Sequence, residues 1–181
     1  MRLPPQRTRI LAGLALFGLL VSSRAATSEP EDELKSAIVL SFLRYSEWPN
    51  PPSGDTALTV AVLGRPAFAQ VLRRVLDGKV VNGRPIRVLE IKSAAEPHAC
   101  QVLYVASDKS ADIKPALAEA RSTRALTIGE SDRFLDYGGA VNLLLVDGHM
   151  SFEVNLQALA GSGIEISSKL LRYGQIKGRL P

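Results

Sequence analysis

Three polar side chains stand where a small ligand could bind. Arg65 follows an apolar segment at 58–63, Ser107 follows a second at 99–106, and Ser131 follows a third at 125–129. If these segments are parallel strands, their carboxyl ends share one edge of the sheet, where α/β proteins bind ligands. A guanidinium in such a crevice suits a carboxylate or phosphate. The alternative, which we favour, is that Ser107 and Ser131 merely cap helices.

The sequence shows no recognisable catalytic or metal-binding constellation. His98 and His149 have no acidic or Cys neighbour at ligand spacing, and a metal site needs three or four convergent ligands. A Gly-x-Ser-x-Gly nucleophile elbow is absent. The segment 161–163, Gly-Ser-Gly, lacks the third glycine and the preceding strand of a phosphate loop, so it is typical of a helix end and a turn. We therefore expect no enzymatic activity, no metal and no cofactor.

Aromatic residues near position 45 form a second candidate site. Tyr45 and Trp48 stand at the exit of an expected first helix, and Trp48 is the only tryptophan. We favour core packing of this helix against the sheet. The alternative is an exposed aromatic anchor for a protein partner or ligand, because aromatic side chains contribute much of the binding energy at interfaces.

Residues 1–25 are predicted to be a cleaved secretory signal peptide. Arg2, Arg7 and Arg9 precede a nearly uninterrupted apolar stretch at 10–21, and the segment 23–25, Ser-Arg-Ala, offers small residues to a signal peptidase. The stretch is shorter than the roughly 20 residues of a membrane-spanning helix, although an uncleaved anchor is an alternative. Because no Cys directly follows the apolar stretch, a lipoprotein signal is excluded.

Without this segment the charges balance. The chain has 22 Lys and Arg against 18 Asp and Glu, and four of the arginines lie within 1–25 with no acid. Residues 26–181 therefore form a neutral single domain, which lacks the basic surplus of a nucleic-acid-binding surface. Its one cysteine, Cys100, can form no intramolecular disulfide. We expect a buried thiol, with a bridge across a dimer as the alternative.

Periodicity predicts alternating strands and helices. Helices are expected at 31–46, 67–76, 111–121 (capped by Ser107 or Asp108) and 131–137, and strands at 58–63, 79–81, 85–91, 99–106, 125–129, 140–146 and 151–155. The first helix is expected to bury an apolar face formed by Leu34, Ile38, Phe42 and Tyr45. Asn-Gly at 82–83 and Asp-Gly at 147–148 predict hairpin turns. The class is α/β: a mostly parallel, Rossmann-like sheet with helices on both faces and an antiparallel edge hairpin.

The C-terminal third has the densest pattern of fixed polar residues. Apolar and polar residues alternate through 151–155, Asn155 can cap a short helix that begins at Leu156, and a second short apolar run follows at 164–166. Ser167 or Ser168 can cap a last helix. We interpret five polar residues of this module as structural caps and pairs: Glu153, Asn155, Ser167, Ser168 and Lys169.

Several segments together resemble the YfiR family of periplasmic proteins (YfiR/HmsC-like). They are 42–49 (Phe-Leu-Arg-Tyr-Ser-Glu-Trp-Pro), 60–64, 83–86, 100–105, 126–129 with 138–139, 152–155 and 166–171. The resemblance spans nearly all of 26–181. It implies an exported regulator, since the best-understood relative represses an inner-membrane diguanylate cyclase from the periplasm and is released by an outer-membrane lipoprotein. Dimers are typical of the family. The two disulfides of some relatives require cysteine pairs that this sequence lacks.

We therefore expect a periplasmic, homodimeric regulatory protein that binds and represses a membrane signalling protein. An inner-membrane diguanylate cyclase is the first candidate, with control of cyclic-di-GMP and biofilm formation as the output. The alternative is a periplasmic small-molecule binding module that serves a sensor kinase or transporter. The candidate contact residues for a partner or ligand are Tyr45, Trp48, Arg65 and Ser131.

Overall fold

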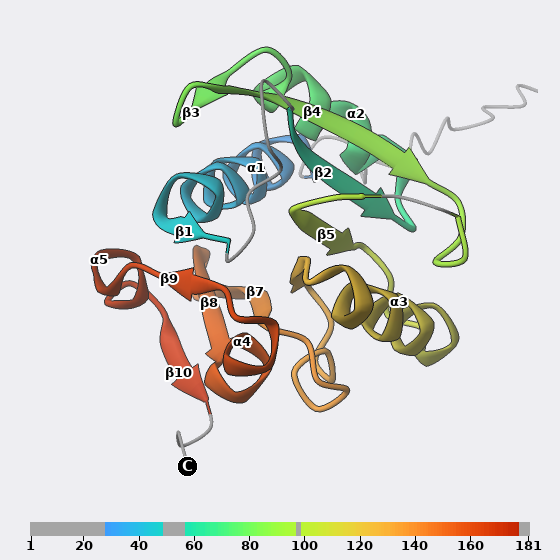
Figure 1. The fold of residues 1–181 in the computed structure, drawn as a ribbon. Coiled ribbons are helices and arrows are strands. Elements are labelled where there is room, and N and C mark those ends of the chain that lie inside the picture. Colours follow the sequence, from blue (N-terminus) through green and yellow to red (C-terminus); the bar gives the residue numbers. More distant parts are fainter. Residues whose placement is uncertain (1–27, 49–56, 97–98, 178–181) are drawn as a thin grey trace, which may run out of the picture.

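The computed structural model describes residues 28–48, 57–96 and 99–177 (Figure 1). The predicted signal peptide, His98 and Pro49 of the 42–49 segment lie outside these ranges.

A twisted sheet organises the described residues. It holds eight strands in the order β10-β8-β7-β6-β5-β2-β4-β3 (Figure 1). The neighbours from β4 to β7 run parallel, whereas β3 is antiparallel to β4 and β8 to β7. The predicted mostly parallel α/β sheet is thus confirmed. The strands are β2 (Leu58–Leu63), β3 (Val80–Val81), β4 (Arg84–Ile91), β5 (Val102–Val105), β6 (Leu126–Gly129), β7 (Val141–Val146), β8 (His149–Asn155) and β10 (Gln175–Lys177).

The strand β10 is an addition that the alternation pattern did not predict. It pairs in parallel with β8, so the predicted β7–β8 hairpin lies next to the sheet edge and β10 forms that edge. Both predicted hairpin turns are present, with positive φ angles at Asn82 and Asp147 and at the glycine after each. The primed turn geometry requires this conformation, which favours Asn, Asp and Gly.

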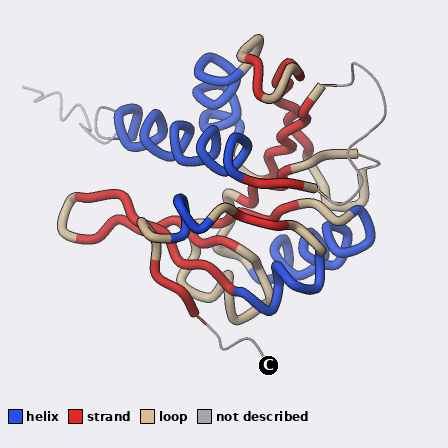
Figure 2. The backbone as a smooth tube through the Cα atoms, turned by 60° about the vertical axis from the view of Figure 1, so that its left-hand side comes forward, coloured by secondary structure: helices blue, strands red, loops and turns tan. Residues whose placement is uncertain are grey.

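Helices cover both faces of the sheet, as predicted (Figure 2). On one face α1 and α2 pack on a core that includes Phe42, Phe68 and Tyr104. On the other face α3 buries Ile113 and Leu117 in a separate apolar cluster. The helices are α1 (Ser28–Tyr45), α2 (Pro66–Leu76), α3 (Ser110–Thr123), α4 (Leu156–Ser162) and α5 (Ser168–Leu171).

The predicted apolar face of α1 is partly wrong. Phe42 is fully buried, but Leu34 is 52% and Tyr45 is 46% exposed. The inner face instead includes Asp32 and Lys35, together with Ser36, Val39 and Leu43. Charged residues can occupy this face because each finds an oppositely charged partner there, which offsets part of the cost of removing them from water.

The predicted helix at 131–137 is also wrong, since this segment forms consecutive turns. Phe134 is fully buried and lies over Gly129 and Gly139. A Cβ atom at these glycines would lie 2.4 Å and 2.2 Å from the Phe134 ring, so only glycine leaves room for it. Packing of one aromatic ring therefore determines the backbone of this segment.

A two-stranded sheet joins the exit of α1 to the C-terminal module. In it β1 (Ser46–Glu47) pairs antiparallel with β9 (Glu165–Ile166), and Ser167 N donates to Tyr45 O at 2.8 Å. The two segments that most resemble the family are thus in direct contact.

Cys100 is a buried free thiol, as expected. Burial raises its pKa to about 12, so very little reactive thiolate exists at neutral pH. We expect a disulfide reagent such as dithionitrobenzoate to label the native protein more than about 100-fold more slowly than the guanidinium-unfolded protein, because the thiolate fraction falls tenfold per pKa unit. Rapid labelling of the native protein, or a covalent dimer on a non-reducing gel, would contradict this expectation.

Candidate functional site

A crevice at the carboxyl ends of β2, β5 and β6 contains the predicted cluster. Arg65, Ser107 and Ser131 all line one cavity of about 530 Å³. Sequence reasoning did not foresee that Lys35, Asp112 and Glu130 also line it. In the sheet order β4 and β5 flank β2, and the crossovers through α2 and α3 lie on opposite faces. The crevice therefore occupies the point where strand order reverses, the usual ligand position in such sheets.

Two of the cations in this crevice, Arg65 and Lys35, are already paired with carboxylates, whereas Lys109 also lines it. Arg65 forms an ion pair with Asp32, and its guanidinium lies over the Phe68 ring. The ammonium of Lys35 contacts Glu130 and lies 2.7 Å from Glu31. An anionic ligand would have to displace these carboxylates, so the structure weakens the case for an anion at Arg65. What the network does directly is attach α1 to the ends of the strands.

Burial perturbs the acids in this network. Burial raises the pKa of Asp32, and the Arg65 charge opposes that rise. Burial also raises the pKa of Tyr104 well above its usual value, helped by the Glu130 carboxylate that accepts its hydroxyl hydrogen bond at 3.3 Å. Tyr104 therefore stays a neutral donor. These shifts follow from a desolvated charge cluster, and they do not by themselves indicate chemistry.

The two serines of the crevice are not helix caps. The N-cap of α3 is Lys109, without a side-chain hydrogen bond, so the predicted cap by Ser107 or Asp108 is wrong. Ser107 instead donates to Asp112 at 2.7 Å and accepts from Lys109 N at 3.2 Å. The Ser131 hydroxyl is buried without a hydrogen-bond partner among the described residues.

Tyr45 lies in a different place, along a groove between α1, α5 and β8. This cavity of about 440 Å³ is lined by Ile38, Ser41, Tyr45, Met150, Phe152, Lys169, Leu170, Arg172 and Tyr173. Tyr173 is 76% exposed. Met150 faces Leu145 across the β7–β8 hairpin, which places both side chains on the same face of the sheet. Leu145 is 56% exposed, so it extends the apolar surface beyond the cavity. We call this surface the α1–α5 groove.

Trp48 is held apart from both sites. Its indole Nε1 donates to Gln101 O at 3.1 Å, and its ring packs against the main core. It lines a separate cavity of about 310 Å³ with Leu43, Leu58 and Arg84. The four candidate residues therefore lie in three different cavities, and only Arg65 and Ser131 share one.

Three of the five polar residues in the C-terminal module, Glu153, Asn155 and Ser167, make structural contacts. Asn155 Oδ1 accepts from Gln157 N and Ala158 N and so caps α4, and Ser167 caps α5 by accepting from Lys169 N. Glu153 pairs with Lys177 of β10 at 2.7 Å. Lys169 differs, because its side chain lines the α1–α5 groove.

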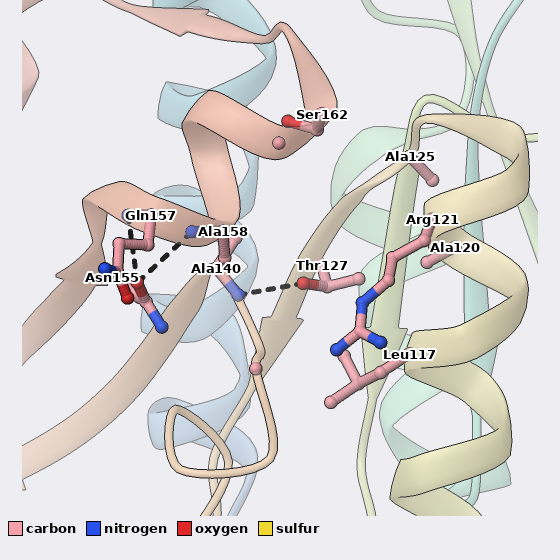
Figure 3. Close-up of a pocket in the computed structure, with 12 residues that line it drawn as sticks. Leu117, Ala120, Arg121, Ala125, Thr127, Ala140, Asn155, Gln157, Ala158 and Ser162 are labelled. Atoms are coloured by element: carbon pink, nitrogen blue, oxygen red, sulfur yellow. Dashed lines mark hydrogen bonds between the residues drawn. The ribbon is translucent and has the colours of Figure 1, made fainter. Parts of the chain in front are cut away.

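A fourth cavity, the Arg121 cleft, was not foreseen from the sequence. It has a volume of about 360 Å³ and lies between α3 and α4, beside the starts of β6 and β7 (Figure 3). Arg121 extends from α3 toward it. No group of three or more His, Cys, Asp or Glu that could hold a metal occurs among the described residues.

Comparison with known proteins identifies the fold and the family. Residues 32–175, which include all three strand-end loops and both segments of the two-stranded sheet, match the YfiR/HmsC-like family. The chain belongs to the YfiR/HmsC-like family. This family is regulatory and non-catalytic, and its members regulate cyclic-di-GMP signalling from the periplasm together with a membrane signalling protein. None of the helices in the described ranges is long and apolar enough to cross a membrane.

A solved structure shares the fold. The crystal structure of a conserved domain protein from Vibrio cholerae O1 biovar El Tor aligns with a TM-score of 0.55 and 13% sequence identity. The alignment covers 81% of this chain and 60% of the Vibrio protein, so this chain spans less than two thirds of that protein's length.

Proposed function

We propose that this YfiR/HmsC-like chain is a periplasmic repressor that binds the periplasmic domain of an inner-membrane diguanylate cyclase. Family membership over residues 32–175 carries the proposal. The proposal also includes relief of this repression when an outer-membrane lipoprotein binds the repressor, and assembly of the repressor as a homodimer.

The α1–α5 groove is the surface best suited to the partner. Its lining is mainly apolar and aromatic, and it includes two basic residues, Lys169 and Arg172. No acidic residue is among the described residues that line it. Aromatic residues beside two basic side chains suit a partner segment that is acidic and amphipathic. Charge complementarity would guide docking, and the aromatic side chains would contribute most of the binding energy.

The small-molecule alternative loses support at the site first proposed for it. The Arg65 guanidinium is paired with Asp32, so the crevice presents no uncompensated cation from Arg65. Protein binding at the groove is therefore our first proposal.

Deletion of the gene tests the repressor proposal. In a strain that keeps its inner-membrane diguanylate cyclases, we expect cellular cyclic-di-GMP to rise on deletion and to return to its original level on complementation with the wild type. Complementation with Tyr45→Ser/Tyr173→Ser should fail, because truncating an aromatic anchor costs about 2 kcal/mol or more in affinity, roughly 30-fold.

Val80→Ser is the matched control. Val80 is also an apolar side chain, 61% exposed, but it lies on β3 at the opposite end of the sheet. This variant should restore repression fully, with all proteins present at equal level. Unchanged cyclic-di-GMP after deletion would refute the cyclase target, and full repression by the double tyrosine variant would refute the groove as the interface.

A further inference from the structure

The Arg121 cleft holds a cation that no carboxylate of the described residues neutralises. The guanidinium of Arg121 makes no ion pair or hydrogen bond with the described part of the chain. It is the one charged group among the residues that line the cleft in that part of the chain. In the strand-end crevice, by contrast, Arg65 and Lys35 each contact a carboxylate.

The backbone beside the cleft leaves room for this guanidinium. Gly138 has a φ of +93°, and a Cβ atom there would lie 2.6 Å from an Arg121 terminal nitrogen. A side chain at position 138 would therefore both strain the backbone and displace Arg121. Figure 3 shows Arg121 reaching from α3 toward the space next to Thr127 and Ala140.

The rest of the lining is mostly apolar or already hydrogen-bonded. Asn155 caps α4, and Thr127 Oγ1 accepts from Ala140 N at 2.9 Å (Figure 3). Ser162 donates to Leu159 O at 2.8 Å. Apolar side chains form most of the walls, namely Leu117, Ala120, Ala125, Ala140 and Ala158, and Gln157 adds one side-chain amide. A ligand would thus meet one charged fork and a largely apolar surface.

We propose that the Arg121 cleft binds a small organic monocarboxylate with an apolar body. A guanidinium fork matches the two oxygens of a carboxylate. A single cation compensates one negative charge, which disfavours a phosphate dianion. The volume of about 360 Å³ lies within the usual range of small-molecule sites. The inference depends on the cleft alone and is separate from the docking of a protein partner at the α1–α5 groove.

The test compares four probes on the purified protein by calorimetry and by NMR chemical-shift mapping. Hexanoate has both the charge and the apolar body, hexanol lacks the charge, acetate lacks the body, and inorganic phosphate replaces the carboxylate. We expect hexanoate to bind one site with a Kd of about 1 mM or lower. The three other probes should bind at least about tenfold more weakly.

Variants then locate the site. Arg121→Gln should weaken hexanoate binding at least about tenfold, and Arg121→Lys should give an intermediate Kd because it keeps the charge and loses the fork. Ala158→Leu should abolish binding by filling the cleft. Arg73→Gln, on the exposed surface of α2, is the matched control and should leave the Kd unchanged.

Four results would overturn the proposal: no saturable binding of hexanoate, equal binding of phosphate, equal binding of hexanol, or an unchanged Kd in Arg121→Gln. Each variant should unfold thermally at the wild-type midpoint. Weaker binding by such a variant then results from the change in the cleft and not from loss of the fold. Repression of the cyclase is measured separately, so a failure of either proposal leaves the other standing.

Discussion

The variant Lys35→Met should lower the free energy of unfolding by about 3–5 kcal/mol, because removing one partner of a buried ion pair leaves an uncompensated charge. The Lys35 side chain is 8% exposed and contacts Glu31 and Glu130. Glu130 is itself 18% exposed, so water cannot fully replace the lost ammonium. Urea denaturation with a shared m-value measures the effect.

Two further variants separate burial from charge. Lys35→Met/Glu130→Leu should recover most of the loss, because an apolar pair of similar volume is often as stable as a buried ion pair. Arg74→Met is the matched control, since Arg74 and its partner Glu29 are 53% and 62% exposed. It should cost less than about 1 kcal/mol. Equal effects of Lys35→Met and Arg74→Met would show that the network is open to water.

The same network predicts an alkaline limit to stability. Burial alone lowers the pKa of Lys35, but its bonds with Glu130 and Glu31 outweigh burial, so the pKa rises above its usual 10.5. A pKa raised on folding stabilises the protein fully below the unfolded pKa, and this contribution disappears as pH rises through the folded pKa. Wild-type stability should therefore fall above about pH 10.5, and the fall should be smaller in Lys35→Met.

Phe134→Ala should cost about 3–5 kcal/mol, the usual range when a fully buried Phe is truncated. The ring is fully buried and fills the space between Gly129 and Gly139. Its removal leaves a cavity under a segment of consecutive turns. Thermal and urea unfolding measure the loss, and Phe134→Leu should lose less because it refills part of the volume.

A second-site test shows whether the ring contact is the cause. Gly139→Ala should destabilise the wild type, because the new Cβ would lie 2.2 Å from the Phe134 ring. In the Phe134→Ala background the same change should cost much less, since the obstructing ring is gone. Contacting residues give such non-additive effects. Additive losses would mean that Gly139 is required for its backbone alone.

The sequence contains strong signals for most of the fold. The strand β2 was predicted with its observed bounds, and the cap by Asn155 was predicted on the correct residue. Ser167, the cap of α5, was one of the two residues predicted for that role. These predictions were correct because apolar runs of strand length, Asn-Gly turns and cap residues determine the structure of their own segment. The grouping of Arg65, Ser107 and Ser131 around one crevice also followed from the topology alone.

The predictions that were wrong or missing concern residues whose partners lie far away in the sequence. Lys35 could occupy the inner face of α1 only because Glu130, 95 positions away, pairs with it. The turns at 131–137 depend on Phe134 meeting glycines on both sides. The sequence did contain two signals for this network. The four-residue spacing of Glu31 and Lys35 is typical of an ion pair on a helix, and Glu130 directly precedes the candidate residue Ser131 at a strand end. Arg121 had no local signal, because only the fold brings it beside Gly138.

The pairing of β1 with β9 has a consequence for the order in which the chain acquires structure. It joins 46–47 to 165–166, so α1 gains its partners in the C-terminal module only after nearly all of the described chain has been delivered. Contacts between distant positions slow folding, since a long loop must close first. During that interval the aromatic and aliphatic side chains of α1 lack their cover, and exposed apolar surface of this kind promotes aggregation. On the proposed export with the N-terminus first, the chain should therefore depend on chaperones until its last strands arrive.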